Sequence, residues 1–154
     1  MQEGIQHQTT SADRRAASTK TLDTLVETRS QTLVLLNELA GMRPFSPDPD
    51  ITDLLQEFCE ALVDYAAAAH FQLYQYFESG NERRKAVIEV AEKVYPQIMK
   101  TTAAILEFND IYDSEEHCKA LDRLDNDLSQ LGEVLADRIT LEDMVIEAMS
   151  KPKH

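Results

Sequence analysis

The sequence contains few of the residues that interrupt helices. Among its 154 residues there are 4 glycines, 5 prolines and no tryptophan, while apolar residues make up 43%. Glycine and proline destabilise helix interiors, so long segments that are rich in Ala, Leu, Glu and Gln and nearly free of both favour helix over sheet. The length is enough for one domain with its own core. The composition therefore predicts a small, globular, all-α protein.

Long apolar runs are also missing. A membrane-spanning helix needs about 20 mostly apolar residues, and the sequence contains no such run. Residues 1–20 are polar and lack the apolar segment of a secretory signal. The two cysteines, Cys59 and Cys118, do not have the spacing of a metal or redox motif. We therefore expect a non-secreted, cytoplasmic protein with reduced thiols and no membrane contact.

The motifs of common enzymes are absent from the sequence. It has no nucleophile motif of the G-x-S-x-G type, no Gly-rich phosphate-binding loop, and no C-x-x-C or H-E-x-x-H motif. None of the 4 histidines follows a glutamate by three residues, the spacing that di-iron helical bundles use. We therefore expect no catalytic residues, no metal and no cofactor. A small-ligand or metal site that uses His70 and Glu142 is kept as an alternative.

Basic residues are scarce, and their distribution is uneven. The net charge is −13, and residues 44–80 hold seven acids without one Lys or Arg. Such a chain repels phosphate backbones, which argues against direct nucleic-acid binding. An acidic face attracts a basic protein surface and speeds encounter with it. The alternative is that the charge serves solubility alone.

Apolar residues recur at helical spacing in four long segments. The expected helices span residues 19–40, 52–78, 82–110 and 114–150, with Thr52 or Asp50 as the cap of the second. Proline-rich residues 42–50 separate the first two. Four amphipathic helices with short connections predict a single-domain four-helix bundle. We expect a polar, disordered tail over residues 1–18, the bundle over 19–150 and a short tail over 151–154. Because proline removes a backbone donor, Pro96 predicts a kink or a break in the third helix near residues 93–95.

The second helix carries a candidate docking strip beside its core stripe. At 100° per residue, Asp64 and Phe71 lie within about 20° of each other. The strip combines acids, small residues that allow close approach, and an aromatic anchor. Its predicted members are Glu57, Glu60, Asp64, Ala67, Ala68, Phe71 and, from the resemblance described below, Tyr74. The alternative is that Phe71 packs inside the bundle.

The fourth helix places a carboxylate on an apolar line, between Ile139 and Ile146. Burying Glu142 without a partner costs several kcal/mol, so it needs a partner or a wet cavity. Arg138 lies one turn earlier, and His70 is a candidate partner across the bundle. This predicts a polar pocket between helices. The alternatives are a rotated helix that leaves Glu142 at the boundary, and a half-buried His70 that is satisfied in the bundle.

Four stretches of the chain resemble the Rsd/AlgQ family, the "regulator of sigma D" anti-sigma factors. The main stretch is residues 58–74, FCEALVDYAAAAHFQLY. Three other stretches are also similar to the family pattern. They are Leu22-Asp23 with Gly41-Met42-Arg43-Pro44, then Tyr95-Pro96, and then Arg138 with Leu141-Glu142-Asp143. The resemblance extends over residues 21–149.

The resemblance implies a function that composition does not. Members of this family bind the primary sigma factor, mainly its basic, C-terminal domain that reads the promoter −35 element, and keep it from core RNA polymerase in stationary phase. Some members of the family dock other signalling proteins, so a regulatory bundle that binds a phosphocarrier or an alarmone enzyme is the alternative. The resemblance places Asp64, His70, Phe71 and Tyr74 in the family's surface and pocket, with Glu142 and Asp143 nearby.

The chain departs from the family pattern at two places. Thr24-Leu25 stands where family members usually have Arg-Trp, and Ala67-Ala68-Ala69 stands where they have Ser-Ala-Gly. We expect a pocket of His70, Arg138, Glu142 and Asp143, and a protein that is a monomer or a weak dimer.

Overall fold

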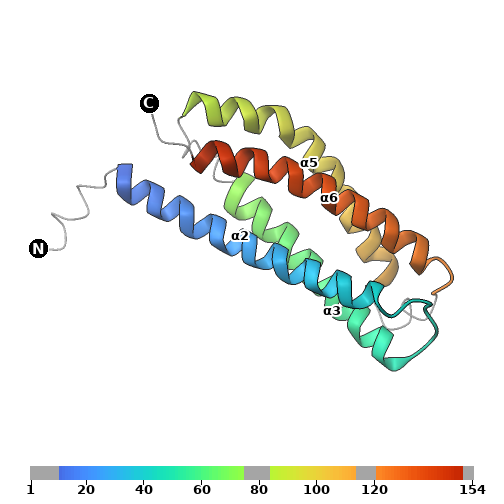
Figure 1. The fold of residues 1–154 in the computed structure, drawn as a ribbon. Coiled ribbons are helices and arrows are strands. Elements are labelled where there is room, and N and C mark those ends of the chain that lie inside the picture. Colours follow the sequence, from blue (N-terminus) through green and yellow to red (C-terminus); the bar gives the residue numbers. More distant parts are fainter. Residues whose placement is uncertain (1–10, 75–83, 114–120, 151–154) are drawn as a thin grey trace, which may run out of the picture.

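The structure is a computed structural model that describes residues 11–74, 84–113 and 121–150. Four α-helices and one π-helical turn follow one another along the chain: α2 (Ser11–Ala40), α3 (Pro49–Ala69), η1 (His70–Tyr74), α5 (Lys85–Tyr112) and α6 (Leu124–Ser150). The helices α2 and α3 lie side by side as one hairpin, and α5 and α6 form the other (Figure 1). The predicted all-α four-helix arrangement is confirmed.

Helix α2 begins earlier than the apolar pattern predicts. It starts at Ser11 and not near Thr19, so residues 11–18, which we assigned to the polar tail, are helical. This segment is rich in Ala and Arg, which are strong helix formers even without an apolar stripe. Residues 1–10 and 151–154 lie outside the described residues, and the division into domain and tails stays a prediction.

Helix α3 begins at Asp48, a cap that lies earlier in the chain than the predicted Asp50 or Thr52. The Asp48 side chain accepts a hydrogen bond from the Asp50 backbone amide at 2.8 Å, and Pro49 occupies the first helical position. Proline suits this position because its missing N–H would have no partner there. The prediction of Asp50 or Thr52 as the cap was therefore wrong. At the other end, the helix passes into η1, and residues 75–83 lie outside the described residues.

The second hairpin differs from its predicted bounds at the turn. Residues 121–123 are not helical, and α6 starts at Leu124 instead of Ser114, with Asp125 and Asp127 in its first turn, where acids favour a helix start. Residues 114–120 are outside the described part. Helix α5 runs through Pro96 without a break, so the predicted break was wrong, while a kink there stays a prediction. Pro96 is on the exposed face of α5. The backbone carbonyl that receives no hydrogen bond from this proline can therefore bond to water.

One apolar core joins the four helices. It includes the buried ring of Phe58 on α3, which meets Phe108 of α5 edge-on with ring centroids 5.9 Å apart. Leu25 of α2 and Leu135 of α6 are buried in the same core. No helix among the described residues is both long and apolar enough to cross a membrane. The packing leaves two places of interest, a polar cluster inside the bundle and an acidic strip on the outside of α3.

Candidate functional site

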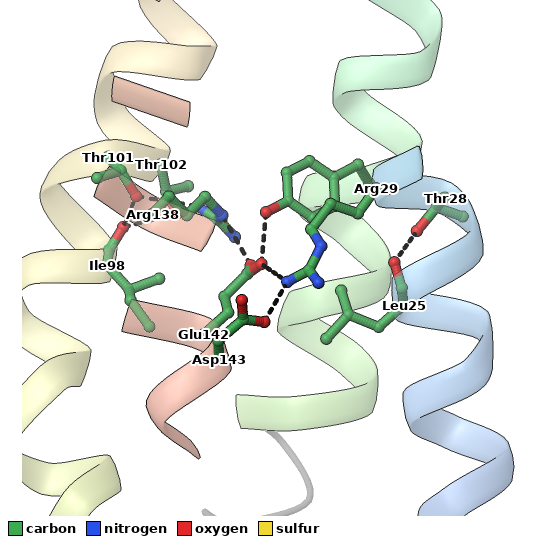
Figure 2. Close-up of polar contacts among 10 residues, drawn as sticks. Leu25, Thr28, Arg29, Ile98, Thr101, Thr102, Arg138, Glu142 and Asp143 are labelled. Atoms are coloured by element: carbon green, nitrogen blue, oxygen red, sulfur yellow. Dashed lines mark hydrogen bonds and ion pairs between the residues drawn. The ribbon is translucent and has the colours of Figure 1, made fainter. Parts of the chain in front are cut away.

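A carboxylate and a guanidinium are fully buried inside the bundle. Arg138 and Glu142 lie one turn apart on α6, and both are 0% exposed. The Arg138 Nε donates to Glu142 Oε2 at 3.0 Å, as their spacing predicts (Figure 2). The alternative of a rotated helix with Glu142 at the boundary is therefore wrong.

Two further groups bind the other oxygen of Glu142. The hydroxyl of Tyr65 on α3 donates to Oε1 at 2.6 Å, and Arg29 of α2 donates to the same oxygen at 3.4 Å. Burying a carboxylate costs little only when charge and hydrogen bonds compensate it. Glu142 therefore ties α2, α3 and α6 together at one point.

The Arg138 guanidinium extends the polar contacts to α5. Its Nη1 donates to the hydroxyls of Thr102 at 2.6 Å and Thr101 at 3.2 Å (Figure 2). The guanidinium carbon lies 5.2 Å from the centre of the Tyr65 ring, a cation–π distance. Its Nη2 has no hydrogen-bond partner among the described residues. We call Arg29, Tyr65, Thr101, Thr102, Arg138 and Glu142 the buried polar cluster.

Asp143 lies at the rim of the buried polar cluster. Arg29 donates to Asp143 Oδ1 at 2.9 Å, and its guanidinium lies between Asp143 and Glu142 (Figure 2). Partial burial lowers the pKa of Arg29, but the hydrogen bond and charge of Asp143, together with Glu142, raise it by more. Burial raises the pKa of Tyr65, and the negative charge of Glu142 raises it further. Tyr65 is therefore a neutral hydrogen-bond donor to Glu142 at neutral pH.

His70 is not where the prediction of a polar pocket placed it. It is exposed, at the junction of α3 and η1, and its ring meets Phe71 edge-on at 5.0 Å. The half-buried histidine that we considered as an alternative is also wrong. The partner of Glu142 across the bundle is Tyr65 and not His70, because Tyr65 is on the inward face of α3. Tyr65 lies five residues before His70.

The pocket prediction missed four residues of the buried polar cluster, namely Arg29, Tyr65, Thr101 and Thr102, and the sequence held a signal for two of them. Tyr65 and Arg29 each fall on an apolar stripe, and each carries a polar end that must find a partner when buried. Their stripe positions make them candidates for a contact with Glu142, but the choice among candidates depends on how the helices are rotated in the packed structure.

The outward face of α3 carries the predicted docking strip. Glu57, Glu60 and Asp64 are exposed, and none of them forms an ion pair with another described residue. Ala67 and Ala68 are half-buried beside them.

Phe71 is 60% exposed, so the alternative that it packs in the bundle is wrong. We call Glu57, Glu60, Asp64, Ala67, Ala68 and Phe71 the acidic strip. The side chain of Tyr74, another predicted member, lies outside the described residues.

The π-helical turn η1 follows the acidic strip directly. It spans His70–Tyr74 and continues the backbone of α3 with a wider turn. A π-helical turn rotates the side chains that follow it away from the α-helical positions, and such turns are frequent at functional sites. Phe71 is in this turn, so its angle relative to Asp64 differs from the one predicted at 100° per residue.

A groove between α3 and α5 adjoins the acidic strip. It has a volume of about 470 Å³, and Glu60, Val63 and Asp64 of α3 line one side. The other side is lined by Asn109 of α5 and by Asp113, the residue after the end of α5. Asn109 and Asp113 could not be predicted from local spacing, because their neighbours on α3 are far away in sequence. Carboxylate and amide oxygens suit a cationic side chain such as Arg or Lys.

Clusters of three or more His, Cys, Asp or Glu side chains that suit a metal ion are absent from the described ranges. Cys59 is buried below the groove and donates to the Tyr112 carbonyl oxygen at 3.6 Å.

The chain is similar to one protein family along most of its length. Residues 5–150 match the family described as "Regulator of RNA polymerase sigma(70) subunit, Rsd/AlgQ". A "Regulator of sigma D" of Enterobacter sp. (strain 638) is 33% identical over 141 residues, which cover 87% of this chain and 82% of that protein. The proteins of the same name from Salmonella newport (strain SL254) and Salmonella typhi are 28% identical over 146 residues, 92% of this chain and 89% of theirs. No solved structure matches the chain at a significant level.

Proposed function

This chain belongs to the Rsd/AlgQ family of sigma-factor regulators, and from this premise we propose that it is an anti-sigma factor for the primary sigma factor. It binds mainly the C-terminal domain of that sigma factor in the cytoplasm and keeps it from core RNA polymerase. Alternative sigma factors then gain access to the polymerase. The protein works by binding and catalyses no reaction.

The observation that carries this proposal is the exposed acidic strip with Phe71 at its end. Its carboxylates are free of ion pairs within the described residues, so none of these residues competes with a partner for them. The sigma domain named by the family resemblance is a basic helix-turn-helix module, which complements them in charge. An exposed aromatic ring beside small residues is typical of a binding anchor.

The groove beside the acidic strip extends the proposed surface to α5. A basic side chain of the partner that enters between Asp64 and Asp113 would meet carboxylates from both sides. The buried polar cluster acts indirectly, because it fixes α3 against the other helices through Tyr65.

The direct test is calorimetric titration of the full chain with the C-terminal domain of the host's primary sigma factor at two salt concentrations. We expect saturable one-to-one binding that weakens as salt rises, because salt screens the exposed carboxylates. Competition with core RNA polymerase for the whole sigma factor is the functional readout. Absence of binding at both salt concentrations would reject the proposal, and a pull-down with a phosphocarrier or an alarmone enzyme would follow.

A further inference from the structure

The walls of the groove between α3 and α5 are acidic. Glu60 and Asp64 face the groove from α3, and Asp113 faces it from the end of α5. Asp110, three residues before Asp113, is exposed on α5 and adds to the negative charge there. Neither Glu60 nor Asp64 forms an ion pair with another described residue, so no residue in this part of the chain competes for them.

The two helices supply no cation that could balance these acids. No Lys or Arg occurs in residues 44–80, which include all of α3, or in residues 101–113, which include the α5 wall. All the charged side chains that line the groove therefore have the same sign. A concave surface with charges of one sign concentrates the negative potential and favours a cationic guest.

Neutral groups line the space between the acidic walls. Val63 is 39% exposed and lies on the groove side of α3. Gln56 of α3 and Asn109 of α5 each add a side-chain amide, whose oxygen accepts hydrogen bonds. The groove therefore offers an apolar contact to a hydrocarbon stem and several acceptors to a polar tip.

We infer that this groove receives one arginine side chain of the partner and selects arginine over lysine. The methylene stem of the arginine packs on Val63, while its guanidinium donates to carboxylates on both walls. The guanidinium is a planar fork with five N–H donors and is weakly hydrated, whereas the lysine ammonium is compact and strongly hydrated. The inference rests on the proposed function and deepens it, because it specifies the side chain that the groove recognises.

Val63→Lys tests the inference in calorimetric titration with the C-terminal domain of the primary sigma factor. The new lysine side chain fills the groove and places its own cation beside Asp64, so the partner's arginine is excluded. We expect binding to weaken by about tenfold or more.

The matched control is Ile111→Lys. Ile111 is also β-branched, is 40% exposed, and lines the space between α5 and α6 on the other side of α5. The substitution changes the net charge as Val63→Lys does, and we expect an affinity within about twofold of wild type, because salt screens a distant exposed charge. Both positions are exposed, so circular dichroism should report the same helix content in both variants.

Single Arg→Lys replacements in the sigma domain test the selection of arginine. Each replacement keeps the charge of the domain, so the long-range attraction is unchanged. We expect one of them to weaken binding to the wild-type chain by about fivefold or more, because the bidentate contact is lost. The same replacement should weaken binding to Ile111→Lys equally and should have almost no effect on binding to Val63→Lys, whose groove is already filled.

The behaviour of the wild-type chain separates failure of this inference from failure of the proposed function. If the wild-type chain does not bind the sigma domain, the proposed function is rejected and the inference with it. If the wild-type chain binds but Val63→Lys binds as tightly as Ile111→Lys, the inference alone is overturned. It is also overturned if no Arg→Lys replacement weakens binding, or if the replacement has the same effect on Val63→Lys as on the wild-type chain.

Discussion

The acidic strip and the buried polar cluster use the same kind of side chain in opposite ways. Asp64 and Tyr65 are neighbours on α3, yet Asp64 faces water on the strip, while Tyr65 is fully buried against Glu142. Glu142 and Asp143 make the same contrast on α6. The buried carboxylate is matched by donors from three residues, whereas the acids of the strip have no ion-pair partner among the described residues.

Physical chemistry explains the contrast. A buried carboxylate that loses its partners destabilises the fold by several kcal/mol, while an exposed one is stabilised by water and stays available. Fold stability therefore depends on the buried polar cluster, and we expect partner binding to depend on the acidic strip. Substitutions that separate these two effects test this division.

Glu142→Ala is expected to have the largest effect on stability. It leaves the Arg138 guanidinium buried without its carboxylate, and we expect the free energy of unfolding to fall by about 3–5 kcal/mol. Urea denaturation followed by circular dichroism measures the change. The matched control is Asp143→Ala, the next residue, whose exposed ion pair with Arg29 should contribute less than about 1 kcal/mol. Equal losses for the two variants would contradict the special role of the buried polar cluster.

Tyr65→Phe is expected to have an intermediate effect that depends on pH. It removes one donor to Glu142, and we expect a loss of about 1–3 kcal/mol at neutral pH. Burial and Glu142 raise the pKa of Tyr65 above its ordinary value, which favours the protonated hydroxyl in the folded state. The contribution is therefore complete below about pH 10 and is lost as the pH rises above it.

The stability gap between wild type and Tyr65→Phe should thus narrow above about pH 10, because the other tyrosines are common to both proteins. Denaturation curves from pH 7 to pH 11 measure this gap. A gap that stays constant or widens would show that the Tyr65 hydroxyl is not held in its protonated form by the fold.

Phe71→Ala is expected to have the smallest effect on stability, within about 0.5 kcal/mol, because its ring is mostly exposed. Phe58→Ala is the calibrating variant, since the Phe58 ring is fully buried and its loss should cost about 3–5 kcal/mol. Thermal or urea unfolding of both variants gives the comparison. A large loss for Phe71→Ala would mean that this ring supports the fold instead of facing a partner.

The sequence predicted the helices and one part of the cluster, because these depend on local spacing. Leucines at helical spacing mark α6, and a spacing of four residues links Arg138 to Glu142. The contacts of Glu142 with Tyr65 and Arg29 depend on how three helices are rotated against one another. The stripe of each helix restricts this rotation without fixing it, which is why the choice of His70 was wrong.

Helix ends and the π-helical turn were the other features beyond the reach of spacing. The start of α3 depends on the hydrogen bond that the Asp48 side chain accepts from the Asp50 amide. Asp50 and Thr52 are also suitable capping residues, so the residue types alone do not decide which one caps the helix. The turn η1 places Phe71, and no residue in the sequence HFQLY predicts a π-helix. The acidity of the strip and its position on α3 were nevertheless predictable, because carboxylates at helical spacing beside an apolar stripe face water.

The most direct test of the central claim compares two double variants in calorimetric titration with the sigma C-terminal domain. Asp64→Asn/Phe71→Ala changes the acidic strip of α3. Asp137→Asn/Met144→Ala changes an exposed acid and an exposed apolar side chain with the same seven-residue spacing on α6. We expect the first to weaken binding by about tenfold or more with little loss of stability. We expect the second to bind as the wild type does. Equal affinity for wild type and the α3 variant, or an equal loss in both variants, would contradict the claim that the acidic strip is the binding surface.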